Sequence, residues 1–349
     1  MKLSLCVILV VCSVQLLFGK DKDKVRAKLS GELMAGIAYE YKGAKSKEHN
    51  FTVYDDETIQ IGKAELETTI KAGSGVKGRF ELEADYNLAG VRLEECWIQF
   101  KFKKPLRLRL GNQRKVFGME ELHGSKTRPT IHRSFLNRYI HSFGVLSYDP
   151  LIQLRGRMGL QENRLTWYAI TGADPDVRIF GNIAFWLDWK YGTVGFSDLY
   201  AWHWNKKYFP HTNCNLGVLS CEYFIKEWYG SMEIFSGVDP NASDITRQMG
   251  EYRKVCFIAS KILVKRKFPV PEKFINGIEP LFSGSWLMND TKTPSQGFGE
   301  VLAGLIIHFG TKLRVRWMTD GSIIYTHDYA GVAWGRYNYK IASQVHLVW

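Results

Sequence analysis

Apolar and polar residues alternate over much of this chain, and the alternation predicts its secondary structure. From Ala27 to Tyr39 every second residue is apolar or glycine, and between Leu106 and Leu110 leucines alternate with Arg107 and Arg109. A period of two gives a β-strand one apolar face and one polar face. Such strands suit the boundary between hydrocarbon and water.

Repetition of this pattern predicts sixteen strands, with fourteen or eighteen left open. Most connections after even-numbered strands are terse turns, such as Gly73-Ser74 and Lys104-Pro105, whereas most connections after odd-numbered strands are longer and more polar. This asymmetry is typical of bacterial transmembrane barrels with an even strand count. The expected strands lie at about 27–39, 59–72, 76–86, 91–103, 106–110, 152–158, 165–169, 180–191, 194–204, 213–225, 228–238, 251–264, 277–288, 297–309, 312–319 and 333–349.

One long stretch, residues 112–143, interrupts the alternation, and connections of that length are usually functional or disordered. The run LRLGNQRKVFGMEEL begins at Leu108, HRSFLNRY begins at His132, and FGV begins at Phe143. Together these runs resemble the phosphate-selective porin O and P family of bacterial outer-membrane channels. Two positions differ from the family pattern, because the Pro expected before Phe117 is missing and His132 stands where an acid is expected.

The resemblance implies an all-β fold, a transmembrane antiparallel β-barrel of about 16 strands with residues 112–143 folded into the lumen as a constriction loop. It also implies a trimeric outer-membrane porin, a passive diffusion channel for small hydrophilic solutes. A preference for anions is expected, with phosphate among the candidate solutes. The implied partners are outer-membrane lipid and lipopolysaccharide and the barrel assembly machinery.

Residues 1–19 have the layout of a secretory signal peptide, with one Lys, an apolar run from Leu3 to Phe18, and Gly19 before a charged stretch. Residues 20–349 then form a single barrel domain. The chain carries a formal charge of +12, but its Lys and Arg residues are dispersed on alternating positions rather than in blocks. In an exported protein this favours a cationic wall facing water, or lipopolysaccharide contact, over a nucleic-acid partner.

The charged positions on the polar strand faces predict the path of an anion. Glu120 and Glu121, on the long stretch, are expected to set a transverse field against an arginine-rich wall. The residues expected to line the anion path are Arg107, Arg109, Arg114, Lys115, Arg155, Arg157, Arg314 and Arg316.

The chain ends in Val345, Leu347 and Trp349, three apolar residues in phase with one another. This ending resembles the terminal-strand signal that the outer-membrane assembly machinery reads. Cys214 and Cys221 leave a disulfide near a rim open, although the favoured interpretation is that each is a small apolar strand residue.

No Gly-x-Ser-x-Gly or His-Glu-x-x-His motif occurs in the chain, so no catalytic residue, metal ligand or cofactor is expected. The alternative from another class is an outer-membrane adhesin or structural barrel without an open pore. A secreted β-rich binding protein is a third possibility. Discrete conductance steps in single-channel recordings would favour the porin.

Overall fold

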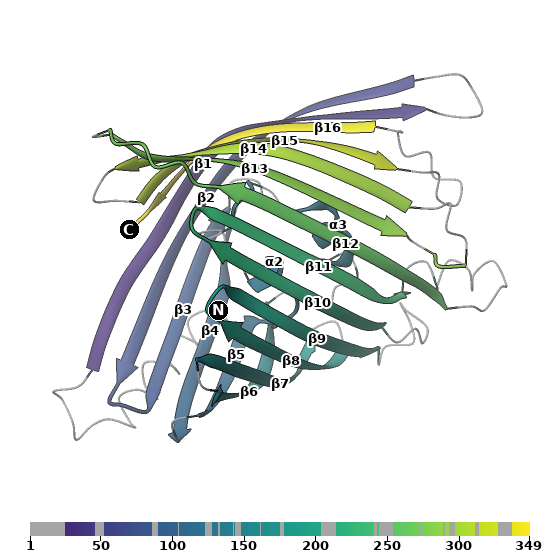
Figure 1. Ribbon diagram of the computed structural model, residues 1–349. Helices are drawn as coiled ribbons and strands as arrows, with labels where there is room; N and C mark the ends of the chain where they lie inside the picture. Colours follow the sequence, from purple (N-terminus) through teal and green to yellow (C-terminus); the bar gives the residue numbers. More distant parts are fainter. Residues whose placement is uncertain are drawn as a thin grey trace.

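In the computed structural model sixteen antiparallel strands close into one barrel, which confirms the predicted fold class and strand count (Figure 1). Each strand pairs with its neighbours in the sequence, and β1 pairs with β16 to close the ring. The structure describes residues 25–45, 52–85, 90–103, 105–122, 128–131, 133–141, 143, 148–160, 162–174, 178–203, 214–240, 243, 254–272, 274–288, 290–292, 297–310, 314–326 and 337–349.

Two short helices, α2 (Met119–Leu122) and α3 (Phe135–His141), lie between β5 and β6. The strands are β1 (Val25–Lys45), β2 (Thr52–Ala72), β3 (Val76–Asp85), β4 (Gly90–Lys103), β5 (Leu106–Arg114), β6 (Tyr148–Leu160), β7 (Asn163–Asp174), β8 (Arg178–Trp189), β9 (Gly192–His203), β10 (Cys214–Ile225), β11 (Trp228–Asp239), β12 (Val255–Arg266), β13 (Ile275–Met288), β14 (Gly297–Gly310), β15 (Arg314–Thr326) and β16 (Tyr337–Val348).

The first hairpin is longer than the sequence predicts. The expected first two strands, 27–39 and 59–72, leave a polar connection between them, but β1 and β2 stay paired as far as Lys45 and Thr52. Backbone hydrogen bonds do not require apolar side chains, so a ladder can continue past the end of the alternation. Similarly, β5 runs to Arg114, so the expected constriction loop begins three residues later than its predicted start.

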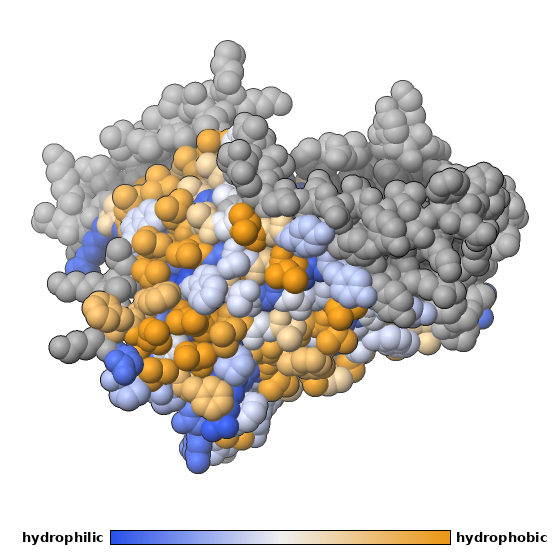
Figure 2. All heavy atoms as spheres, turned by 90° about the horizontal axis from the view of Figure 1, so that it is seen from above, coloured by the Kyte–Doolittle hydropathy of each residue, from blue (hydrophilic) through white to orange (hydrophobic). Residues whose placement is uncertain are grey.

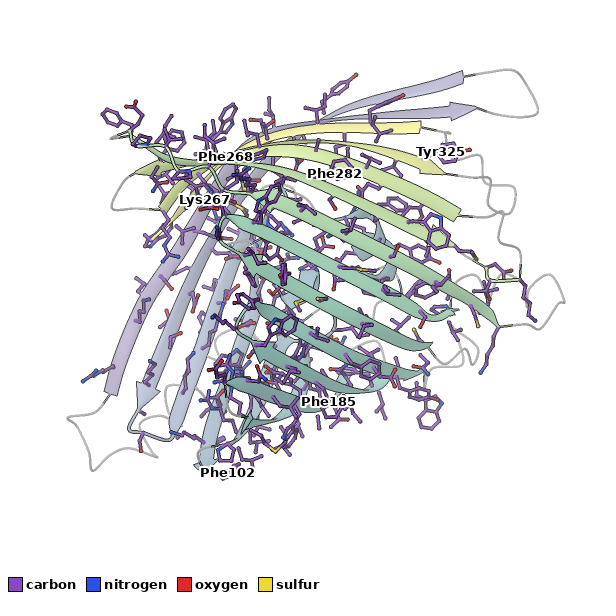
Figure 3. All side chains as sticks on the ribbon, in the orientation of Figure 1. Phe102, Phe185, Lys267, Phe268, Phe282 and Tyr325 are labelled. Atoms are coloured by element: carbon purple, nitrogen blue, oxygen red, sulfur yellow. The ribbon has the colours of Figure 1, made fainter. Side chains whose placement is uncertain are left out.

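The apolar residues of the alternating strands lie on the outer surface of the barrel. Ile183 and Phe185 on β8 are 53% and 45% exposed, and orange apolar residues cover much of the outer face visible in Figure 2. Aromatic residues lie near both ends, with Phe102 and Phe268 at the short-turn end and Tyr325 towards the other (Figure 3). An apolar band flanked by aromatic residues is the outer surface expected of a barrel in a membrane. Among the described residues, no helix has the length and hydropathy needed to span a membrane.

A disulfide between Cys214 and Cys221 does not form, and both are free cysteines on one strand, β10. Seven residues of extended chain separate them by about 23 Å, far beyond the reach of a disulfide. Cys214 is buried and Cys221 is partly buried. The interpretation of each as a small strand residue is therefore confirmed.

The barrel closes where the last residue meets β1. The Gly31 N–H donates to the Trp349 carbonyl at 3.2 Å, and the Trp349 N–H donates to the Gly31 carbonyl at 3.1 Å. Trp349 and Val345 are 47% and 49% exposed on the outer surface. The terminal apolar residues thus lie at the seam between the first and last strands.

Trp349→Ala is expected to lower the amount of folded barrel in the outer membrane without changing the conductance of the channels that do fold. The reason is that an exposed aromatic at the end of the chain can be recognised during assembly but lines no part of the lumen. Quantifying the variant in purified outer membranes, alongside single-channel recording, checks both halves. Normal membrane levels of the variant would contradict the assembly role.

Candidate functional site

The connection between β5 and β6, residues 115–147, is called the loop segment below, and its described part packs against buried side chains of the barrel strands. Hydrogen bonds join it to β6, β9, β11, β12, β14 and β15. Ser197 on β9 donates to the Val116 carbonyl at 2.8 Å, and Glu233 on β11 accepts from the Met119 N–H. In the middle of the segment, the Phe135 N–H donates to Glu300 on β14 at 2.8 Å, and the Ile131 N–H donates to Asp320 on β15 at 2.7 Å.

Apolar packing fixes the same face of the loop segment. Phe117, Leu136 and Ile140 are at most 1% exposed and belong to one core cluster with inward residues of β6 to β14. The rings of Phe135 and Phe298 meet edge to face with centroids 4.1 Å apart. Because this cluster lies mainly towards β8–β14, the charged residues of β2–β6 face the other side of the loop segment.

Glu120 is the buried anchor of the loop segment. Its carboxylate pairs with Lys261 on β12 at 2.5 Å and accepts two hydrogen bonds from Ser134, each 2.7 Å long. Burial alone would raise the pKa of Glu120, but the Lys261 charge and these hydrogen bonds lower it to about 2. Glu120 is therefore paired at close range, whereas the sequence predicts an acid that sets an electric field across the lumen. The Glu121 side chain lies outside the described residues.

Four predicted arginines come together on β5 and β6 and are called the arginine wall: Arg107, Arg109, Arg155 and Arg157. Arg107 lies directly opposite Arg155 in the strand register. Arg109 and Arg155 stack on aromatic rings, with guanidinium carbons 3.9 Å from the Trp97 centroid and 5.2 Å from the Tyr168 centroid. Among the described residues, none of the four has a carboxylate within ion-pair distance.

The other predicted arginines and Lys115 lie apart from the arginine wall. Arg114 stacks on Tyr148 with its guanidinium carbon 4.7 Å from the ring centroid, and Lys115 is buried in an ion pair with Asp149. Arg316 donates to His346 at 2.8 Å, while Arg314 is exposed at the start of β15. The structure therefore splits the predicted anion path into several separate environments.

On the inner face of β2–β4, by contrast, acidic and basic side chains pair with one another. Lys63 pairs with both Glu65 and Glu83, and Arg92 pairs with Glu83 and Glu94. The carboxylates of Glu65, Glu83 and Glu94 gather within 4.8 Å of one another, which is a spacing that could suit a metal ion. Lys63 already supplies positive charge there, so this cluster is a salt-bridge network rather than a candidate metal site.

A cavity of about 620 Å³ lies between the loop segment and β2–β6, next to the longer connections. Its cationic side chains outnumber its acids by four, and Asn112, Asn137 and Tyr148 add neutral polar groups. Burial, followed by nearby Arg133, lowers the pKa of His141 in its lining, so this imidazole is neutral at pH 7. The charged lining residues are Lys63, Arg92, Arg114, Arg128, Arg133 and Arg138, with Glu83 and Glu94.

Sequence reasoning identified only Arg114 among the charged residues of this cavity. Arg128, Arg133 and Arg138 lie on the loop segment, where no strand alternation assigns a facing direction. The sequence feature that could have identified them is their spacing, because these three arginines fall within eleven residues. Lys63 and Arg92 follow the strand alternation, but they were not distinguished from ordinary solvated positions.

The sequence profile of the phosphate-selective porin O and P family matches residues 32–159, a range that contains β1 to β5, the loop segment and nearly all of β6. The match confirms the resemblance seen in the sequence. No curated protein sequence matches the chain.

Several solved structures share the fold. The anion-selective porin from Comamonas acidovorans superposes with a TM-score of 0.59 at 13% identity, covering 93% of this chain and 100% of that one. OmpF of Salmonella typhi, in complex with daunomycin, gives 0.62 at 10% identity over 95% and 99% of the two chains. In vitro folded OmpT of Vibrio cholerae, in its trimer form, gives 0.59 at 11% identity over 94% and 100%.

At these identities the likenesses show the fold, and the profile match shows the family signature over residues 32–159. The chain is a closed 16-stranded porin-type barrel, and its residues 32–159 carry the signature of the phosphate-selective porin O and P family.

Proposed function

We propose that this protein is an outer-membrane porin that admits small hydrophilic solutes by passive diffusion and prefers anions. The observation that carries the preference is the arginine wall, four guanidinium groups on two adjacent strands without a described carboxylate partner. A permeating ion in a narrow lumen with low-dielectric walls experiences the sum of such fixed charges. The wall therefore favours anions over cations.

The position of the cavity supports the same preference. Arg114 at the end of β5 and Tyr148 at the start of β6 line it, so it lies towards the longer connections. Arg107 and Arg157 lie near the short turns that precede β5 and follow β6. An anion would thus meet excess positive charge on both sides of the loop segment, which we propose as the constriction of the channel.

The remaining parts of the proposal follow from the family and the exported character of the chain. Residues 1–19 act as a cleaved signal peptide, the barrel machinery recognises the terminal strand, and the barrel contacts outer-membrane lipid and lipopolysaccharide. The trimeric form of the OmpT structure supports a homotrimer. Phosphate is one candidate solute, in keeping with the name of the matched family.

The test of this function is the reversal potential across a planar bilayer under a KCl gradient. Anion selectivity is expected at low salt, and it should weaken towards 1 M KCl, where the screening length falls to about 3 Å. The pair Arg107→Ala with Arg155→Ala should lower the anion-to-cation permeability ratio at least about threefold, because half of the wall charge is lost.

A charge-matched control is Lys254→Ala with Lys292→Ala, which removes two exposed cations outside the arginine wall and should leave the ratio nearly unchanged. Cation selectivity of the unmodified protein would refute the anion preference. Absence of conductance steps from folded protein would instead favour a structural or adhesive barrel.

A further inference from the structure

Trp97, on β4, links the neutralised face of β2–β4 to the arginine wall. Its side chain is 4% exposed, and its ring packs against two cations. The guanidinium carbon of Arg109 lies 3.9 Å from the ring centroid, and the ammonium of Lys77 lies 5.3 Å from it. Attraction between a cation and an aromatic face holds the cation without neutralising its charge.

The strand register explains why Trp97 and Arg109 meet. Arg109 pairs with Gln99 and Gly111 pairs with Trp97, so Arg109 is the diagonal neighbour of Trp97. Gly111 has a φ of 127°, and a Cβ there would lie 2.2 Å from the Cys96 carbonyl oxygen. Glycine at position 111 thus permits the close approach of β5 to β4 beside the indole.

Trp97 also forms a hydrogen bond with the carboxylate of Glu95. The indole N–H donates to Glu95 Oε2 at 3.0 Å, and the same oxygen lies 2.9 Å from Arg79 Nε. Glu95 is therefore directed towards Arg79 on β3.

Arg109 makes its hydrogen bonds elsewhere, with the neutral side-chain oxygens of Gln99 at 3.3 Å and Gln113 at 3.4 Å. Its Nε is buried and has no hydrogen-bond partner among the residues that the structure describes. Two cations near the same carboxylate thus have different partners, since Arg79 is paired with acids and Arg109 is held by an aromatic face and two amides.

We propose that Trp97 is a positioning residue for ion selectivity. It keeps Arg109 against its ring and Glu95 against Arg79, so that the charge of Arg109 stays uncompensated in the lumen. This inference rests on the proposed anion preference and adds to it a residue that carries no charge. Removal of the indole lets Glu95 leave Arg79, which keeps Glu67 and Glu81 as partners, and pair with Arg109. One of the four positive charges is then cancelled locally, at the arginine wall.

The test compares Trp97→Leu, Glu95→Gln and Trp97→Leu/Glu95→Gln, using the anion-to-cation permeability ratio from reversal potentials in KCl gradients. The single variant should lower the ratio about twofold or more, because one of four wall charges is compensated. Glu95→Gln should raise the ratio more in the Trp97→Leu background than in the unmodified protein, because only without the indole does the Glu95 carboxylate pair with Arg109. Trp97→Phe, which keeps an aromatic face, should lose less than Trp97→Leu.

Trp186→Leu is the matched structural control. Trp186 is an equally buried tryptophan, 6% exposed, on β8 and within the apolar cluster. Its loss should leave the ratio unchanged, and heat-modifiable migration in electrophoresis checks that each variant is folded. An unchanged ratio in Trp97→Leu, or an effect of Glu95→Gln that is the same with and without the indole, would overturn the positioning role.

These measurements test the anion preference and the positioning role of Trp97 independently. The sign of the reversal potential of the unmodified protein tests the anion preference. The shift caused by Trp97→Leu, and the larger effect of Glu95→Gln in that background, can be read whichever ion the unmodified channel prefers.

Discussion

Replacement of Lys261 by Met is expected to release the loop segment from the barrel wall and to give a higher, noisier single-channel conductance. Lys261 is the cation that pairs with buried Glu120, and the two side chains are 9% and 6% exposed. Removing one partner of a buried ion pair leaves an uncompensated charge and costs about 3–5 kcal/mol. Movement of α2 away from the wall is the direct way for Glu120 to regain water.

Two comparisons sharpen this experiment. Lys265→Met alters a lysine on the same face of β12 that pairs with Glu279 instead of the loop segment, and it should leave the noise unchanged. In Glu120→Gln/Lys261→Met both charges are absent, so the segment should stay closer to its original position than in the single variant. Conductance of Lys261→Met identical to that of the unmodified channel would show that the pair is not the anchor.

The same anchor predicts a dependence on pH. The pKa of Glu120 is lowered from 4.5 to about 2, so its contribution to stability is fully present above pH 4.5 and is lost as the pH falls towards 2. The conductance of the unmodified channel should therefore be steady from pH 7 to about 5 and become noisier below pH 4. Glu120→Gln should lack the part of this change that arises from Glu120.

Gly31→Ala is expected to reduce the folded barrel to a small fraction of its normal level, because Gly31 lies at the closing seam. A Cβ there would lie 2.4 Å from the Trp349 ring and 2.6 Å from the Glu65 carbonyl oxygen. Neither distance is tolerated, so β1 would have to shift against β2 or β16. The folded fraction is measured by heat-modifiable migration of membrane-extracted protein.

Gly299→Ala is the matched control, since the nearest atom to a Cβ at that position is 3.9 Å away. It adds the same methyl group to a barrel strand and should fold normally. Gly31→Ala/Trp349→Ala removes the ring contact but keeps the clash with the Glu65 carbonyl, so its folded fraction should stay below that of Trp349→Ala alone. Normal folding of Gly31→Ala would mean that the seam adjusts more easily than this packing implies.

The local pattern of residues was sufficient to predict the barrel itself. Alternation between Leu106 and Leu110 assigns the two faces of β5, and the terse turns at Gly73-Ser74 and Lys104-Pro105 place short connections at one end. Both signals arise from interactions within a strand or a hairpin, so they can be read one stretch at a time. The strand ends were less well predicted, as in the first hairpin, because backbone pairing continues where side-chain patterning stops.

The partner of each charge, by contrast, was decided only by tertiary structure. Glu120 and Lys261 are 141 residues apart, and Trp97 reaches Arg109 only through the register of β4 and β5. A period of two determines which face a side chain occupies, but it does not determine whether the neighbour across the strand or across the lumen is an acid, an amide or an aromatic ring. Arg79 and Arg109 have the same place in the alternation, and barrel closure and register alone make one an ion-paired residue and the other a stacked cation.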